Sequence, residues 1–204
     1  PDAKRRYISV SRYLVVGVMC VGLGIGIFAT EILIILTRPA YLPAAPYVGF
    51  LTYVHIFGGF GVVLSTGAMM GKQLFSMSGS VAVGAVINLG LNFLLIPRFG
   101  VWGATVSTVI SYAAIQAILY VWVQRKYPID YPMRRMVSAL ALTFAILVIS
   151  QGVPPLYFPL RIALKLGLYL MFPIGLLVLH LVEWREVKLA VQLVKAKVLT
   201  YMLD

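Results

Sequence analysis

A single acidic residue stands inside an otherwise apolar stretch of the sequence. Glu31 lies in ATEILIIL, residues 29–36. It precedes the end of the apolar run by about seven residues, which is roughly 10 Å at the 1.5 Å rise of an α-helix. A carboxylate facing lipid at that depth is unfavourable. We therefore expect Glu31 to face the protein interior or a cavity, either protonated or paired, with coupling to an ion or a buried structural role as alternatives.

Two basic residues near the other end of the chain share a helical face. Arg161 and Lys165 are four residues apart, at the outer end of the last apolar stretch, and that spacing places them on one side of an α-helix. Side chains of this kind can extend to lipid headgroups. Alternatively, together with Arg98 or Arg38, they present positive charge to an anionic substrate.

Two amide side chains show the same spacing in another apolar stretch. Asn88 and Asn92 are four residues apart, and Ser80 and Gly84 extend their face toward the preceding turn. Small and polar residues let helices approach closely and form hydrogen bonds in a membrane. The two asparagines therefore either pack against a neighbouring helix or line a water-filled cavity and contact a polar substrate.

The remaining inventory of reactive groups is small. His55 stands beside the glycine-rich segment 58–61 and is expected either to make an interhelical hydrogen bond or to relay a proton. The chain has two histidines, one cysteine and six acidic residues, with no HExxH, paired carboxylates or Ser/His/Asp set. The lone Cys20 excludes an internal disulfide and a cysteine-based zinc site. We expect no enzymatic activity, no metal and no cofactor.

The composition indicates that lipid surrounds these groups. Of the 204 residues, 61% are hydrophobic and 11% are charged, and the mean hydropathy is +0.97. So few charges cannot provide the surface of a water-soluble protein. A transmembrane helix needs about 20 apolar residues. Six stretches come close, and we expect an all-α bundle of antiparallel spans at about residues 13–37, 47–70, 76–96, 101–123, 134–151 and 162–182.

The basic residues indicate an orientation for the bundle. All of the 17 Lys and Arg residues except Arg38, Arg98, Arg161 and Lys165 fall on the side that carries both chain ends. The positive-inside rule places that side in the cytoplasm, and we expect a bacterial cytoplasmic (inner) membrane. The same distribution explains the net charge of +11 without nucleic acid. The chain starts at Pro1 without an initiator Met, which we interpret as a fragment or a processed product.

The last residues show a different pattern. In residues 183–204, valines and alanine recur at helical spacing opposite Lys188, Gln192 and Lys195. This pattern is typical of a basic amphipathic helix lying on the cytoplasmic leaflet. A partner-binding helix is the alternative.

The third and fourth apolar stretches are expected to form a tight hairpin. Residues 97–100, Pro-Arg-Phe-Gly, predict a turn that folds the second helix back on the first. A stripe of small residues follows at helical spacing and is expected to pack the two helices closely. Its members are Gly100, Ala104, Ser107 and Ser111.

Two stretches carry a family resemblance. One is NLGLNFLLIPRFGVWGATVSTVIS, residues 88–111, and the other is ATEILIILTRPAY, residues 29–41. Together they resemble the C-terminal half of polysaccharide flippases of the multidrug/oligosaccharidyl-lipid/polysaccharide exporter superfamily. The likeness covers most of residues 10–150. It departs from the family at residues 37–39, Thr-Arg-Pro, where a Phe-Gly-type turn is usual.

The resemblance implies a fold and a function. Such transporters have 12 to 14 spanning helices in two lobes, so the six spans would be the ninth to fourteenth and form part of the second lobe. The implied activity is translocation of lipid-linked saccharide precursors across the membrane by alternating access. The implied partners are the lipid-linked saccharide, membrane lipid and the remaining N-terminal lobe of the same protein.

Two other functions remain open at this stage. A cation-coupled drug or metabolite antiporter of the same superfamily would use Glu31 as its intramembrane acid. A non-transporting membrane scaffold would tolerate leucine at Glu31, Asn88 and Asn92, whereas a transporter would lose flux.

Overall fold

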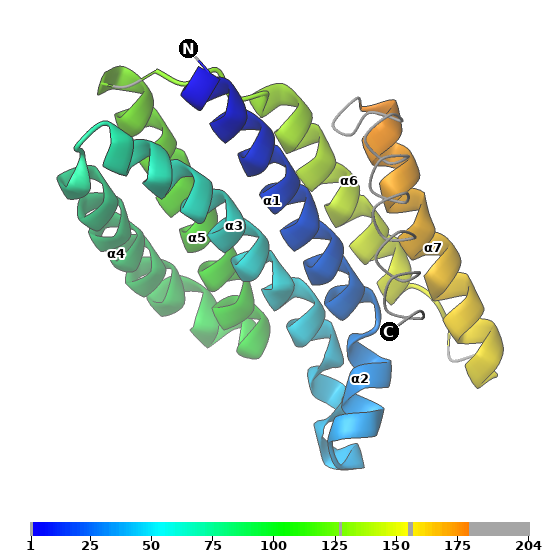
Figure 1. Cartoon of the computed structure of the whole chain (residues 1–204). Helices are drawn as coiled ribbons and strands as arrows, with labels where there is room; N and C mark the ends of the chain where they lie inside the picture. The colour runs from blue at the N-terminus through cyan, green and yellow to red at the C-terminus, as the bar shows by residue number, and fades with distance from the viewer. Residues whose placement is uncertain (1, 127, 155–156, 180–204) are drawn as a thin grey trace, which may run out of the picture.

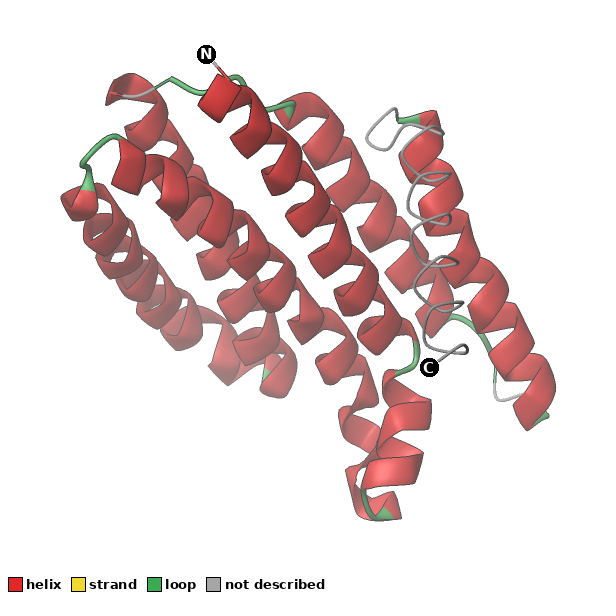
Figure 2. Ribbon diagram, in the orientation of Figure 1, coloured by secondary structure: helices red, strands yellow, loops and turns green. Residues whose placement is uncertain are grey.

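The computed structural model describes residues 2–126, 128–154 and 157–179, and these ranges contain helices and no strands (Figure 2). In chain order the helices are α1 (Asp2–Ile27), α2 (Ala29–Leu36), the 3-10 helix η1 (Pro39–Ala44), α3 (Ala45–Met70), α4 (Leu74–Phe99), α5 (Val101–Lys126), α6 (Met133–Gln151) and α7 (Phe158–Val178). Six helical segments of this part of the chain are long and apolar enough to cross a membrane. The predicted all-α membrane fold is therefore confirmed.

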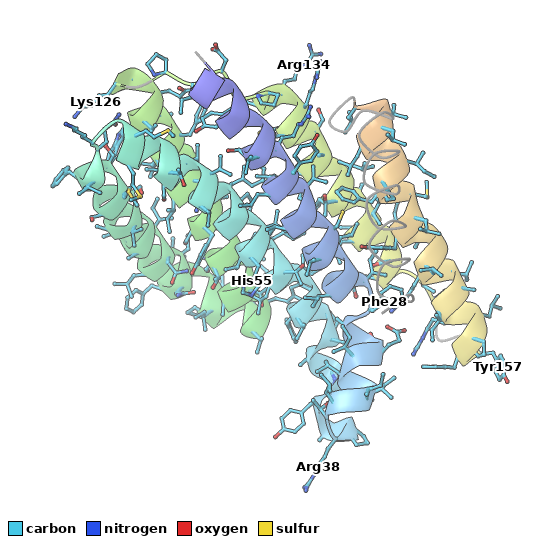
Figure 3. All side chains as sticks on the ribbon, viewed as in Figure 1. Phe28, Arg38, His55, Lys126, Arg134 and Tyr157 are labelled. Carbon is cyan, nitrogen blue, oxygen red and sulfur yellow. The ribbon has the colours of Figure 1, made fainter. Side chains whose placement is uncertain are left out.

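Successive long helices run in opposite directions through the bundle (Figure 1). Lys126 and Arg134 lie at the end that holds the N-terminus, whereas Arg38 and Tyr157 lie at the opposite end, which we call the distal end (Figure 3). The short elements α2 and η1 also lie at the distal end. The amphipathic helix expected at residues 183–204 lies outside the described residues.

The first span is broken where a continuous helix over residues 13–37 was expected. α1 ends at Ile27, Phe28 takes φ −94° and ψ 15°, and α2 begins at Ala29. Gly24 and Gly26 precede the break, and glycine weakens a helix because it gains more backbone freedom on unfolding than other residues. The break leaves α2 as a separate eight-residue helix.

The hairpin between α4 and α5 turns later and more tightly than predicted. α4 continues through Pro97 to Phe99, and the turn is made at Gly100 with φ +56°. Pro97 lies within the last turn of α4 although a proline inside a helix removes one backbone hydrogen bond. Gly100 suits the turn because a side chain would strain this backbone conformation.

The packing face of this hairpin also differs from the prediction. Gly100 is exposed and Ala104 is only half-buried, whereas Gly103, Ser107 and Ser111 are buried. A Cβ on Gly103 would overlap the backbone carbonyl of Leu95 in α4. The contact stripe therefore starts at Gly103, because Gly100 is used for the turn.

A second close helix contact joins α1 to α3. A Cβ added to Gly22 would lie 2.9 Å from Ile56 Cγ1, and one added to Gly26 would lie 3.3 Å from the carbonyl oxygen of Gly49. The two α1 glycines are four residues apart, the spacing that lets membrane helices approach closely. This pair was not among the predicted packing residues, although the spacing of Gly22 and Gly26 is visible in the sequence. Around it lies the apolar core, with Met19, Leu23, Ile27, Ile56 and Leu147 each 1% exposed.

Candidate functional site

Three charged side chains meet near the distal end of the bundle and form what we call the ion cluster, Glu31, Arg161 and Lys165. The Lys165 ammonium donates to both carboxylate oxygens of Glu31, at 2.8 Å to Oε2 and 3.0 Å to Oε1. Arg161 Nε lies 2.9 Å from Glu31 Oε1. Glu31 and Lys165 are each 5% exposed. The cluster therefore joins two parts of the chain that are 134 residues apart in sequence.

Two short stretches of backbone position these groups. Glu31 lies in the first turn of α2, where the partial positive charge of the helix N-terminus favours a carboxylate. Arg161 and Lys165 lie in the first part of α7, which begins at Phe158. The guanidinium carbon of Arg161 lies 5.8 Å from the centroid of the Phe158 ring, within the range of a cation–π contact. The break at Phe28 allows α2 to bring its carboxylate to α7.

The charges of the cluster do not cancel. Two cations surround one carboxylate, so the cluster carries one unit of excess positive charge. The contact from Arg161 Nε is close enough for an ion pair but lacks the alignment of a hydrogen bond. Burying charges is costly unless they are paired and hydrogen-bonded. The arrangement pairs Glu31 with both cations and leaves Arg161 as the less satisfied of the two.

The cluster resolves the alternatives that the sequence left open for its members. Of the two states expected for Glu31, the structure shows the paired one. Lys165 does not extend outward, as a headgroup contact would require, but is buried against Glu31. Arg38 and Arg98, considered as partners of the two cations, are exposed and do not join the cluster. Matching opposite charges at similar depths in different spans would have predicted the pairing.

Asn88 and Asn92 lie elsewhere in the molecule. They are on α4, which stands at the opposite side of the bundle from α7 (Figure 1). Asn92 Nδ2 donates to Asn88 Oδ1 at 3.0 Å, and both side chains are half-buried. The Oδ1 atom of Asn92 is buried and has no hydrogen-bond partner among the described residues. The two amides thus satisfy each other in part and do not contact the ion cluster.

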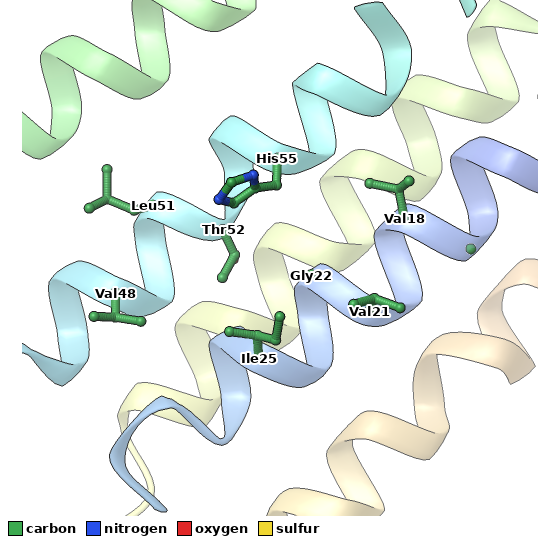
Figure 4. Close-up of a pocket in the computed structure, with 9 residues that line it drawn as sticks. Val18, Val21, Gly22, Ile25, Val48, Leu51, Thr52 and His55 are labelled. Carbon is green, nitrogen blue, oxygen red and sulfur yellow. The ribbon is translucent and has the colours of Figure 1, made fainter. Parts of the chain in front are cut away.

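His55 lines an open groove between α1 and α3 with a volume of about 550 Å³. Figure 4 shows its imidazole on the α3 side, with Val21 and Ile25 of α1 across the groove. The side chain is exposed, and it makes no hydrogen bond to another described residue. The interhelical hydrogen bond expected for His55 is therefore not present within the described part of the chain.

The described residues contain no group of three or more His, Cys, Asp or Glu side chains that could hold a metal ion. Among the described residues of the spanning helices, the ion cluster is the one place where opposite charges are buried together. Ionisable side chains buried within membrane spans are candidates for a functional site, and the ion cluster is the candidate that these residues offer.

Comparison with known proteins shows that the chain is similar to part of a membrane protein. It is 35% identical over 106 residues to an uncharacterized membrane protein of Methanocaldococcus jannaschii. The protein is a multi-pass membrane protein. The match includes 48% of this chain and 19% of the relative. The chain therefore corresponds to a small part of the relative's length. No protein-family model and no solved structure matches the chain.

Proposed function

We propose that this chain is part of a transporter that moves lipid-linked saccharide precursors across the cytoplasmic membrane by alternating access. The observation that carries the proposal is the ion cluster of Glu31, Arg161 and Lys165. Ionisable groups buried within membrane spans are costly to maintain and mark substrate or ion pathways. The excess positive charge suits an anionic phosphate group, which arginine binds in a bidentate manner.

The break between α1 and α2 supports the same proposal. Discontinuous helices are a recurrent feature of substrate sites in transporters, because the freed helix ends hold charged groups. Here the N-terminal turn of α2 holds Glu31 against α7. The resemblance of residues 29–41 and 88–111 to polysaccharide flippases adds the substrate class. The charge distribution supports an orientation with both ends of this segment in the cytoplasm.

The proposed partners follow from this assignment. They are the lipid-linked saccharide, the surrounding membrane lipid and an N-terminal lobe of the same protein, with no nucleic acid and no enzymatic step. The diphosphate that links lipid to sugar would contact Arg161 and Lys165, while the saccharide would lie toward the cavity between the lobes.

A reconstituted transport assay tests the proposal. The full-length protein is placed in liposomes that contain a fluorescent lipid-linked diphosphate saccharide, and transfer between leaflets is measured by access of a quencher. We expect transfer by the wild type and a loss of at least about tenfold in Lys165→Gln, since one charge-assisted contact contributes roughly 1.5 to 3 kcal/mol. Arg98→Gln, which removes an exposed cation outside the cluster, is the matched control. No transfer by the wild type with an intact fold would reject the proposal.

A cation-coupled drug or metabolite antiporter is the second candidate function. The observation in its favour is that Glu31 is the one acidic residue within the described helices of residues 10–126, 133–151 and 158–178. Coupling would require Glu31 to exchange its two basic partners for the transported cation during each cycle. Drug efflux that depends on an ion gradient and is abolished by Glu31→Gln, without any transfer of lipid-linked saccharide, would favour the antiporter.

A further inference from the structure

The ion cluster has an arrangement in which one partner can be exchanged for another. We propose that Glu31 is a built-in counter-ion that occupies a phosphate-binding site formed by Arg161 and Lys165, and that an arriving phosphate group displaces it and releases α2 from α7. The inference deepens the proposed function, and it rests on that function only for the identity of the molecule that carries the phosphate.

The hydrogen-bonding capacity of the two cations is used unequally. Lys165 directs both of its hydrogen bonds to Glu31. The nearest contact of Arg161 with the same carboxylate is through Nε, and it is out of hydrogen-bond alignment. Within the described part of the chain, the Arg161 guanidinium makes no hydrogen bond to a side chain or backbone group. A guanidinium normally binds an oxyanion through two parallel N–H groups. Arg161 therefore retains a free pair of donors of the kind that a phosphate requires.

Access to the cluster runs past Arg161. Its side chain is 15% exposed, compared with 7% for Lys165 and 6% for Glu31. The neighbouring side chains of Phe158, Leu160 and Leu164 are exposed. A ligand approaching along the first turns of α7 meets Arg161 before it reaches the carboxylate, so the less satisfied cation is also the more accessible one.

The element that carries Glu31 is short: it packs on α3 and η1 and buries only Ala29 and Glu31. α2 has eight residues, is separated from α1 at Phe28 and ends at Leu36 before the 3-10 helix. Its last residues, Ile34, Ile35 and Leu36, are exposed and add no core packing. Among the described residues, the ion cluster is the polar contact that holds the side chains of α2 to α7.

The charge balance favours the exchange. Arg161 and Lys165 together carry two positive charges, and Glu31 neutralises one of them. A diphosphate carries more negative charge and more acceptor oxygens than one carboxylate, so it satisfies both cations at once. Glu31 then leaves for the distal membrane surface with α2. This predicts that removing the acidic residue of the cluster strengthens anion binding.

Binding of inorganic pyrophosphate tests the exchange directly. The full-length protein is placed in phosphatidylcholine nanodiscs, and binding is measured by isothermal titration calorimetry. We expect Glu31→Gln to bind pyrophosphate about tenfold more tightly than the wild type, because the competing charge is gone and one like charge within a few ångströms contributes at least this much. Arg161→Gln and Lys165→Gln should bind at least about tenfold more weakly. Arg98→Gln should match the wild type.

Several results would overturn the proposal. Binding that is unchanged or weaker in Glu31→Gln, with a cooperative thermal transition retained, contradicts displacement of a counter-ion. If that variant does not fold, Glu31→Asp replaces it, and its affinity should exceed that of the wild type because the shorter side chain reaches the cations less well. Equal weakening in Arg98→Gln and Arg161→Gln would show nonspecific attraction and would also reject the site.

The source of the phosphate is decided by the lipid composition of the nanodiscs. If bilayer headgroups fill the site, phosphatidylglycerol discs should weaken pyrophosphate binding by the wild type more than binding by Arg161→Gln. If a soluble or lipid-linked diphosphate is the ligand, the two proteins should lose affinity by the same factor, because the negative surface of these discs repels any anion. Either result supports the site, whereas a greater loss in Arg161→Gln than in the wild type contradicts it.

The release of α2 has a separate readout. Spin labels at Leu36→Cys and Leu160→Cys, in a Cys20→Ala background, report the distance between α2 and α7 by pulsed electron paramagnetic resonance. Both labelled positions are exposed. The distance should increase with pyrophosphate and already be increased in Glu31→Gln, and an unchanged distance would reject the release. Tighter binding in Glu31→Gln without any transport by the wild type would leave the inference standing and reject the proposed function.

Discussion

The α4–α5 hairpin and the ion cluster solve the same problem in different ways. Both hold two helices together within the membrane. In the hairpin, the two helices are neighbours in sequence and pack through glycine and serine. Gly103, for example, lies directly against the backbone of Leu95. The cluster does so with opposite charges from distant parts of the chain. Small-residue packing leaves no partner to exchange, whereas an ion pair can exchange its partner, and this difference makes the cluster the candidate for a functional contact.

The largest effect is expected when the cluster loses its buried cation. Lys165→Met leaves the Glu31 carboxylate with Arg161 alone, and breaking a buried pair by removing one partner costs about 3 kcal/mol. Both the free energy of unfolding and transport should fall. Chemical denaturation in detergent measures the first, and the double variant with Glu31→Gln should recover at least about 1 kcal/mol. Purely additive effects would show that the two residues are not coupled.

A smaller effect, on stability alone, is expected in the hairpin. Gly103→Ala forces a methyl group against the Leu95 carbonyl, and overpacking of this kind costs about 2 kcal/mol. Transport per folded molecule should be retained, because the ion cluster is unchanged. Gly90→Ala is the matched control, since a Cβ at Gly90 meets nothing within 4 Å. A loss of transport at full stability in Gly103→Ala would remove the distinction between the two regions.

The asparagine pair tests whether α4 has a role beyond packing. Asn92→Leu removes the hydrogen bond to Asn88 within α4, and a polar pair four residues apart on one helix contributes about 0.5 kcal/mol. We expect a loss of stability near that value in thermal unfolding. Transport measured in the same preparation separates the alternatives, since a cavity role predicts lost flux and a scaffold tolerates the leucine.

The smallest effect is expected at His55. The side chain is exposed in the groove between α1 and α3 and makes no hydrogen bond to a described residue. His55→Leu should therefore change the free energy of unfolding by less than about 0.5 kcal/mol. A change above about 2 kcal/mol would show that the imidazole has a partner when the whole protein is assembled.

Hydropathy was sufficient to predict the bundle because lipid imposes one simple requirement on every span. An apolar segment of sufficient length in a membrane must be helical, so α3 to α7 lie close to the predicted ranges. Helix ends depend on single residues, and the prediction was less accurate there. The turn at Gly100 and the stripe that begins at Gly103 differ from the expectation because one glycine with positive φ made the turn by itself.

The ion cluster could be predicted only in part. The sequence shows that Glu31, Arg161 and Lys165 are costly inside a membrane, and it therefore identifies them as candidates. It does not show which helices are neighbours, so Arg38 and Arg98 were equally plausible partners for the two cations. The pairing depends on the break at Phe28 and on the placement of α7, which are properties of the folded chain.

The break at Phe28 also determines how far a movement at the ion cluster can spread. α1 is fixed to α3 at Gly22 and Gly26, where the two helices are in close contact. If α2 is released from α7, a change in the backbone torsions at Phe28 would let it shift on α3, against which it packs, without tilting α1. A ligand at the cluster would thus rearrange the distal end while the opposite ends of the helices stay in place. The structural change would then be confined to one side of the membrane.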